Sequence, residues 1–203
     1  AEVLGKYCGV NNLVVFGGAL VGVLVEAFVP RRSRHSVQVA LTLITLATAF
    51  AALVTKARHD KGVTLGGALV IDGPALFQMG AILVLGILSV MLMAEKFSSA
   101  GADAFTPMGA AVPGSKLEAT ATRAGWGTGE VFPLALFSIA GMMIFPAAGD
   151  LLTMFVALEV LSLPLYILTG LARRKRLLSQ EAALKYFLLG SFSSAFFLFG
   201  SAL

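Results

Sequence analysis

Long apolar runs, separated by short polar or basic segments, form the main pattern of this chain. A helix that crosses a membrane needs about 20 apolar residues, because the hydrocarbon core is about 30 Å thick and each helical residue adds about 1.5 Å. Six runs approach or reach that length, at residues 13–29, 37–54, 74–94, 131–148, 151–171 and 180–203. The pattern therefore predicts an all-α, polytopic membrane protein with six transmembrane helices in this sequence.

The composition agrees with a membrane protein and excludes several kinds of site. Of the 203 residues, 58% are hydrophobic and 13% are charged, whereas a soluble protein has about 25% charged residues. Cys8 is the only cysteine, which excludes an internal disulfide and a cysteine-based metal cluster. The sequence has no CxxC, HExxH or P-loop motif, so we expect no redox or nucleotide chemistry and no bound cofactor in this chain. The net charge of +4 comes from loop residues and indicates membrane topology rather than nucleic-acid binding.

The spacing of the spans divides the chain into three segments. Residues 1–94 contain three N-terminal transmembrane helices, and residues 130–203 contain the fourth, fifth and sixth. Residues 95–129 are rich in Ala, Gly, Ser, Thr and Pro and lack an apolar repeat, so we expect a flexible cytoplasmic loop there. No charge or polar tail closes the last span at Leu203, which predicts that the chain is the N-terminal part of a longer protein.

Lysines and arginines in the short loops predict the orientation, because they are enriched on the cytoplasmic side of membrane proteins. The loop at 30–36 carries three arginines, and the loop at 172–179 carries Arg173, Arg174, Lys175 and Arg176. A third basic group, at residues 56–61, is the exception, because a six-helix topology places it on the opposite side. We therefore expect the loops at 30–36, 95–129 and 172–179 in the cytoplasm, the N-terminus outside, and the protein in the cell membrane.

Glu159 lies in the middle of the apolar run 151–171 and is the first candidate for function. A carboxylate at that depth costs several kcal/mol unless it is paired, hydrated or protonated, and such residues usually move ions or protons. Pro164 lacks an N–H and disturbs the carbonyl of Val160, so we expect a kinked helix with a free carbonyl beside Glu159. Ser162 adds a hydroxyl at a similar level. The structural alternative is a protonated Glu159 that is hydrogen-bonded inside the bundle.

Lys185 is the second candidate, about 7 Å inside the predicted helix 180–203 at about 1.5 Å per residue. Two interpretations are open: the side chain extends to the membrane interface, or it takes part in a proton relay. Ser179 is the predicted N-cap of that helix, so Lys185 is a cation placed against the helix dipole. Glu159 lies about 18 Å from the corresponding end of its own helix. We therefore do not expect a direct ion pair between Glu159 and Lys185.

Other charged and small residues have structural interpretations. Glu26 lies close to three arginines in the sequence, which predicts a local ion pair at the membrane interface. Glu130 and Asp150 precede the fourth and fifth spans and are expected to be solvated acids at helix starts. Gly190 and three nearby serines predict a contact face for a neighbouring helix, and these serines are Ser191, Ser193 and Ser194.

Two motifs around Glu159 and Lys185 are similar to those of one protein family. Residues 157–170 read Ala-Leu-Glu-Val-Leu-Ser-Leu-Pro-Leu-Tyr-Ile-Leu-Thr-Gly, and a basic loop and then residues 179–200 around Lys185 follow them. Asp72-Gly73, before the third span, is a further match. These residues resemble the antiporter-like subunit N of respiratory complex I, the proton-pumping NADH:quinone oxidoreductase. The first two spans match that family only as hydrophobic helices.

The resemblance implies a fold of fourteen helices with two inverted five-helix half-channels, of which this chain contains the first part. It implies that Glu159 is the key acid of the fifth helix, Lys185 the lysine of the sixth, and Glu130 the acid before the fourth. The direct partner of the acid, a lysine of the seventh helix, would follow Leu203. The resemblance also implies that partner subunits bind NADH, FMN, iron–sulfur clusters and quinone. The expected partners are the neighbouring antiporter-like and small membrane subunits, within the lipid bilayer.

Three other functions compete with a complex I subunit. A subunit of a multisubunit cation/proton antiporter shares the glutamate and the lysine, although the surroundings of Glu159 and Lys185 favour complex I. A structural membrane subunit would use its buried charges only to hold helices together. A stand-alone membrane enzyme would need a catalytic cluster, which the sequence lacks. The leading hypothesis is a subunit that couples NADH oxidation and quinone reduction to proton transfer across the membrane.

Overall fold

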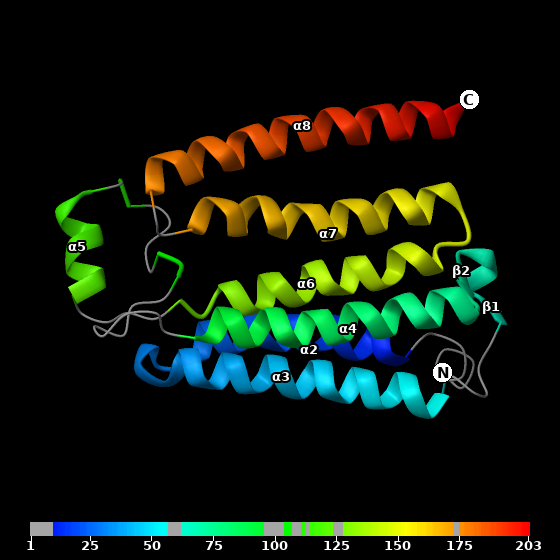
Figure 1. Cartoon of the computed structure of the whole chain (residues 1–203), viewed down its shortest axis with the longest axis horizontal. Coiled ribbons are helices and arrows are strands. Elements are labelled where there is room, and N and C mark those ends of the chain that lie inside the picture. The colour runs from blue at the N-terminus through cyan, green and yellow to red at the C-terminus, as the bar shows by residue number, and fades with distance from the viewer. Residues whose placement is uncertain are drawn as a thin grey trace.

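The six predicted spans form helices in the computed structural model, which describes residues 10–56, 62–95, 104–106, 111–112, 114–123, 128–172 and 175–203. The helices are α2 (Val10–Phe28), α3 (Arg31–Lys56), α4 (Gly73–Ala94), α6 (Val131–Ile144), α7 (Leu151–Leu171) and α8 (Arg176–Ala202). They run alongside one another in one bundle, with α8 at its edge (Figure 1). The prediction of an all-α membrane fold is confirmed.

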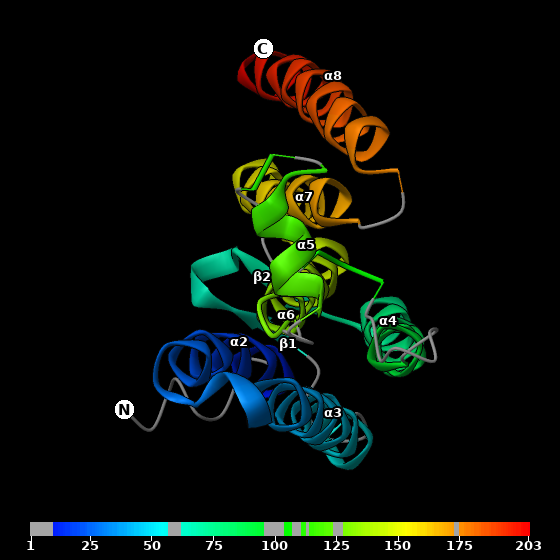
Figure 2. The same cartoon turned by 90° about the vertical axis from the view of Figure 1, so that its left-hand side faces the viewer.

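Five of these helices are long and apolar enough to cross a membrane, and α6 is shorter. The α6 helix passes into a 3₁₀ turn, η2 (Phe145–Ala147), at Pro146, so the apolar helix ends at Ala147. Ten of the 14 residues of α6 are buried, because it packs against α2, α3, α4 and α7. Figure 2 shows α6 near the centre of the bundle, between the α2–α3 pair and α7. The shortest of the six helices is therefore the one that protein covers most.

Aspartate caps set the starts of α4 and α7. Asp72 accepts a hydrogen bond from the backbone N–H of Ala75 at 2.8 Å, and a proline follows in the first turn of α4. Asp150 accepts from the backbone N–H of Thr153 at 2.6 Å and from the Thr153 hydroxyl at 3.0 Å. Asp150 is therefore an N-cap with a defined partner rather than only a solvated acid, and α7 begins at Leu151 as predicted.

The start of α8 differs from the prediction. Lys175 adopts a left-handed conformation, with φ of 56°, and turns the chain directly into a helix that begins at Arg176. Ser179 lies inside α8, where its hydroxyl donates to the Lys175 carbonyl at 3.4 Å. The prediction that Ser179 is the N-cap is wrong, because the helix begins three residues earlier, at Arg176, and Lys175 occupies the N-cap position.

A short β-hairpin, which the apolar pattern did not predict, connects α3 to α4. Strands β1 (Gly62–Thr64) and β2 (Leu69–Ile71) pair in an antiparallel register, and a 3₁₀ turn, η1 (Leu65–Gly67), joins them. The β2 strand also forms an isolated antiparallel bridge from Leu69 to Ala148, and the N–H of Gly149 donates to the carbonyl of Ala68 at 2.8 Å. The hairpin therefore holds the turn between α6 and α7.

The connection at 95–129 contains structure that the sequence did not predict. It includes helix α5 (Lys116–Arg123). The N–H of Thr106 donates to the carbonyl of Leu171 at 2.8 Å. The buried guanidinium of Arg176 donates to the carbonyls of Gly170 at 3.0 Å and Ala111 at 3.3 Å. The described parts of this connection are thus attached to the α7–α8 turn, whereas the predicted flexibility and cytoplasmic location stay predictions.

The connections divide between the two ends of the bundle. The α2–α3 turn, α5 and the α7–α8 turn lie at one end, and the hairpin, η2 and the end of α8 lie at the other (Figure 1). This arrangement agrees with the predicted grouping of three loops on one side of the membrane. Three residues named in the sequence analysis, Cys8, Arg173 and Arg174, lie outside the described residues, as does most of the basic group at 56–61.

Candidate functional site

Glu159 lies in the middle of α7, eight residues after Leu151 and twelve before Leu171. At about 1.5 Å per residue, these positions are about 12 Å and 18 Å from the two ends of the helix. The side chain is half-buried, and α7 itself lies between α6 and α8. Within the described part of the chain, the Glu159 carboxylate makes no hydrogen bond or ion pair. The structural alternative, in which Glu159 is hydrogen-bonded inside the bundle, therefore finds no partner for the carboxyl group among the described residues.

The backbone next to Glu159 offers unusual hydrogen-bonding groups. Pro164, inside α7, has no N–H, so the carbonyl of Val160 lacks the donor that a regular helix would give it. The hydroxyl of Ser162 donates to the carbonyl of Glu159 at 3.3 Å. The buried hydroxyl of Ser138, on α6, donates to the carbonyl of Leu161 at 2.9 Å. One turn of α7 thus carries several polar contacts, and the carbonyl of Val160 lies within it.

The backbones of α6 and α7 approach each other closely beside Glu159. A Cβ atom on Gly141 would lie 2.5 Å from the Leu161 nitrogen and 2.8 Å from its Cα atom. Only glycine fits such a contact, which brings α6 against the turn that carries Glu159. The sequence analysis missed Gly141 and Ser138, although two small residues three positions apart on an apolar helix were an available signal.

Ring contacts fix the register between α7 and α8. The ring centroids of Phe155 and Phe197 are 6.2 Å apart, and those of Tyr166 and Phe187 are 5.7 Å apart. Because the two helices run antiparallel, this register places Glu159 level with about Ser194 on α8. It places Lys185 about nine residues, or about 13 Å, along the bundle from Glu159. A direct ion pair between Glu159 and Lys185 is therefore too long, as expected.

Small and aromatic residues form the contact between α7 and α8. Tyr166 is buried, and a Cβ atom on Gly190 would overlap with the Tyr166 hydroxyl. Ser194 is also buried, whereas Ser191 and Ser193 are exposed. The predicted contact face is thus confirmed for Gly190 and Ser194 only. Tyr166, which the sequence analysis did not select, is its aromatic partner.

Lys185 has a local partner on its own helix. Its ammonium group lies 2.5 Å from the Glu181 carboxylate, in an i, i+4 ion pair in which both side chains are largely exposed. Because α8 begins at Arg176, Lys185 is about 14 Å from the helix start at about 1.5 Å per residue. The predicted depth of about 7 Å is therefore wrong. However, the 27 residues of α8 span about 40 Å, which exceeds the hydrocarbon core, so the interfacial interpretation stays open.

Glu130 lies far from the other two candidates. It is exposed at the N-cap position of α6 and makes no side-chain capping hydrogen bond. The contact of Gly141 with Leu161 places Glu130 level with the end of α7, about 20 Å along the bundle from Glu159 at about 1.5 Å per residue. The described chain therefore does not bring Glu130, Glu159 and Lys185 together.

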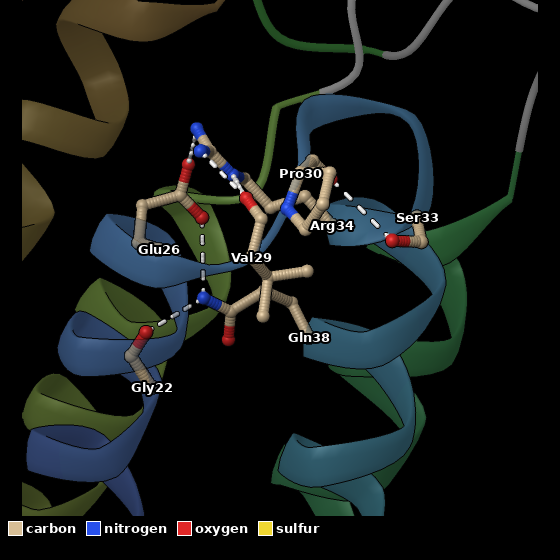
Figure 3. Close-up of polar contacts among 7 residues, drawn as sticks. All are labelled: Gly22, Glu26, Val29, Pro30, Ser33, Arg34 and Gln38. Carbon is tan, nitrogen blue, oxygen red and sulfur yellow. Dashed lines mark hydrogen bonds and ion pairs between the residues drawn. The ribbon is translucent and has the colours of Figure 1, made fainter.

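A second polar cluster lies at the end of α2 and the start of α3 (Figure 3). Glu26 forms the predicted ion pair, with Arg34, at 2.9 Å. The Arg34 guanidinium also donates to the carbonyl of Val29 at 2.9 Å and 3.2 Å. The amide nitrogen of Gln38, a fully buried residue, donates to the Glu26 carboxylate at 3.2 Å and to the carbonyl of Gly22 at 2.7 Å. The predicted local pair is confirmed, and Gln38 is an additional member.

Comparison with known proteins gives a consistent result. Residues 148–203 match the protein family described as NADH:quinone oxidoreductase/Mrp antiporter, TM. The chain is 56% identical over 210 residues to NADH-quinone oxidoreductase subunit N of Rhodococcus opacus. It is 54% identical over 201 residues to the subunit N of Beutenbergia cavernae, and 52% identical over 208 residues to that of Mycobacterium tuberculosis. Each match covers 94% of this chain.

The same matches cover only 38–39% of the three relatives, so the chain spans about two fifths of the length of these curated proteins. Among solved structures, the chain is similar to a chain of respiratory complex I from Thermus thermophilus, with a TM-score of 0.67 and 28% identity. That match covers 95% of this chain and 35% of the other. The resemblance predicted from two motifs is therefore confirmed, and it includes the first two spans. This resemblance and the apolar helices of the chain together show that it is a multi-pass membrane protein.

Proposed function

We propose, from its homology with NADH-quinone oxidoreductase subunit N over 94% of its length, that this chain forms part of a proton-translocating membrane subunit. The complete protein would couple NADH oxidation and quinone reduction, carried out by its partners, to proton transfer across the membrane. The observation that carries the proposal is the position of Glu159, an acidic side chain at mid-helix with no partner within the described chain.

Glu159 would act by gaining and losing a proton. Its carboxyl group lies in the turn of α7 where Pro164 leaves the Val160 carbonyl without a helical donor. The carboxyl and this carbonyl can both form hydrogen bonds with water. A change of charge nearby, driven by electron transfer elsewhere in the complex, would change the proton affinity of this carboxyl group. The proton would then pass along water molecules, because the distance of about 13 Å along the bundle to Lys185 is too long for direct transfer.

Lys185 and Glu130 would have secondary roles. The ion pair with Glu181 holds Lys185 in place, and a protonation change at Lys185 would have to break or strengthen that pair. Glu130 would lie near the α7–α8 turn, at the end of the bundle where protons would enter. We assign both to proton transfer between the loop end of the bundle and the level of Glu159.

The redox groups would belong to partner subunits. The described residues contain no group of three or more His, Cys, Asp or Glu side chains that could hold a metal ion. We assign the binding of NADH, FMN, iron–sulfur clusters and quinone to other subunits of the complex. The direct partners of this chain would be the neighbouring antiporter-like and small membrane subunits. The α2–α3 turn, α5 and the start of α8 lie at one end of the bundle (Figure 1), which supports a cytoplasmic location for that end, an outside N-terminus, and insertion in the cell membrane.

The second candidate function is a subunit of a multisubunit cation/proton antiporter. The family matched by residues 148–203 includes Mrp antiporters in its description, so the α7–α8 region alone does not separate the two functions. The identity of 52–56% with subunit N favours the oxidoreductase. In both functions Glu159 would be the central acid.

Purification of the full-length protein through an affinity tag in mild detergent should separate these functions. We expect NADH:quinone oxidoreductase activity and flavin to elute with the tagged protein, because subunits of one assembly stay together. A tagged, unrelated membrane protein from the same cells is the control for carry-over. Elution with other membrane subunits but without flavin would instead support the antiporter.

Replacing Lys185 with alanine should reduce proton pumping by less than about threefold, or under ~0.7 kcal/mol in the limiting barrier. The loss is small because the exposed Lys185 is a relay group and not the central acid. Glu181→Gln is the matched control, since it breaks the same ion pair and keeps the lysine. NADH-driven proton uptake by membrane vesicles measures both. If the two variants lose the same activity, Lys185 serves only the ion pair, and its assignment to the relay is wrong.

A further inference from the structure

The α3 helix carries a buried stripe of polar side chains that the proposed function does not use. Gln38, Thr42 and Thr45 are spaced four and three residues apart, so they lie on one face of the helix. Gln38 and Thr42 are fully buried, and Thr45 is 8% exposed. This face packs against α2, because Gln38 bonds to Gly22 and Thr45 lies against Gly18, and α6 also contacts α3. Such a stripe inside an apolar bundle needs hydrogen-bond partners.

The orientation of the Gln38 amide is fixed by its two partners. Its nitrogen donates to the carbonyl of Gly22 and to the Glu26 carboxylate, and both of these groups are acceptors only. A flipped amide would therefore place oxygen against oxygen at both contacts. The Gln38 oxygen consequently turns away from Glu26 (Figure 3), and it receives no hydrogen bond from the described residues.

The Thr42 hydroxyl also lacks the partner that is usual for this residue type in helices. Thr48, Ser89 and Thr169 each donate to the carbonyl four residues earlier, at 2.7–2.8 Å. The Thr42 oxygen makes no such bond and has no partner in the described part of the chain. Because Thr42 follows Gln38 by one helical turn, two buried oxygens without partners lie on neighbouring positions of the same face.

We propose that α2, α3 and α6 enclose at least one bound water molecule, held by the Gln38 oxygen and the Thr42 hydroxyl. Water fits this pair, because it can donate to the Gln38 oxygen, which is only an acceptor, and can accept from the Thr42 hydroxyl or donate to it. A buried water normally makes two to four such bonds to otherwise unpaired polar groups. Through the Gln38 amide, this water is linked to the Glu26–Arg34 ion pair.

The water site is local and does not extend across the membrane. Thr45 lies against Gly18 of α2, where an added Cβ atom would meet its side chain at 2.3–3.0 Å. Beyond that level, the fully buried apolar residues Val15, Leu46 and Ala49 fill the bundle. The water therefore satisfies the polar end of the α2–α3 contact, and the α2–α3 pair offers no continuous proton path.

Electron cryomicroscopy of the full-length protein, purified from its own membrane in whatever assembly it occurs, tests the proposal directly. At a resolution that shows ordered water, we expect a density peak within hydrogen-bonding distance of both the Gln38 oxygen and the Thr42 hydroxyl. Side chains that close the space and bond to each other, with no such peak, would overturn the proposal.

The variant Thr42→Val gives a second, independent test, because valine has nearly the same shape and no hydroxyl. If the hydroxyl binds water, the variant should lower the midpoint temperature of thermal dissociation of the assembly by roughly 2–4 °C. An unpaired hydroxyl predicts the opposite sign, since its removal relieves a buried polar group. Thr48→Val is the matched control, as Thr48 is exposed and bonded to its own helix. An unchanged or raised midpoint for Thr42→Val would contradict the water site.

Discussion

Replacing Glu159 with alanine is expected to reduce proton pumping by at least about tenfold, which corresponds to ~1.4 kcal/mol in the limiting barrier. Quinone-linked NADH oxidation should fall with it, because the two processes are coupled. Glu159 is the only acidic or basic residue of α7, and the nearest candidate for a substitute, Lys185, lies about 13 Å along the bundle. Since the carboxylate makes no hydrogen bond within the described chain, its loss should leave assembly intact.

The measurement is NADH-driven proton uptake by membrane vesicles, normalised to the amount of assembled complex. Val156→Ala, a change at a half-exposed position one turn earlier on α7, is the control and should pump normally. Glu159→Gln separates the functional from the structural role, because glutamine keeps the size and hydrogen bonding of the side chain but cannot carry a proton. Normal pumping with glutamine would show that Glu159 holds helices together and does not transfer protons.

Replacing Gly141 with valine should destabilise the α6–α7 contact by about 1–3 kcal/mol, the usual cost of overpacking a dense interior. A Cβ atom there would lie 2.5–2.8 Å from backbone atoms of Leu161, and backbone atoms in a helix cannot move aside as a side chain can. The two helices would have to separate next to Glu159. We therefore expect less assembled protein, and lower pumping per assembled complex in what remains.

Two glycine variants provide the comparison for Gly141. Gly17→Ala lies in α2, where an added Cβ atom meets nothing within 4 Å, so it should have little effect or stabilise the helix slightly. Gly190→Ala should have an intermediate effect, because its added Cβ atom meets the end of the Tyr166 side chain rather than a backbone. The amount of subunit retained in the complex after heating ranks the three variants. Equal retention for Gly141→Val and Gly17→Ala would contradict the close contact.

The main helices could be predicted from the sequence because membrane spans depend on local apolar length. The prediction of α7 was accurate to the residue, since Asp150 is an N-cap whose partner is only three positions away. The start of α8 was missed because the left-handed conformation of Lys175 is unusual for a lysine. The hairpin was missed because its three-residue strands are too short for an alternating pattern and are paired partly with Ala148, far along the chain.

The candidate site was predictable only in part. Glu159 and Pro164 stand out because a charge and a proline are rare inside an apolar run. Ser138, Gly141 and Tyr166 are ordinary residues in a membrane helix, and their importance comes from the helices that they contact. The depth of Lys185 depended on where α8 begins, so one missed turn changed its position by several ångströms.

The bridge between the hairpin and the α6–α7 turn joins two segments that the ribosome makes at different times. The hairpin is made and carried to its side of the membrane well before α6 and Ala148 emerge from the ribosome. In a nascent chain that inserts its helices in sequence order, the edge of β2 that pairs with Ala148 lacks this partner until the α6–α7 turn is made. A delay between the third and fourth insertions would leave that edge accessible to other chains, so the spacing of the two segments bears on how reliably the nascent protein assembles.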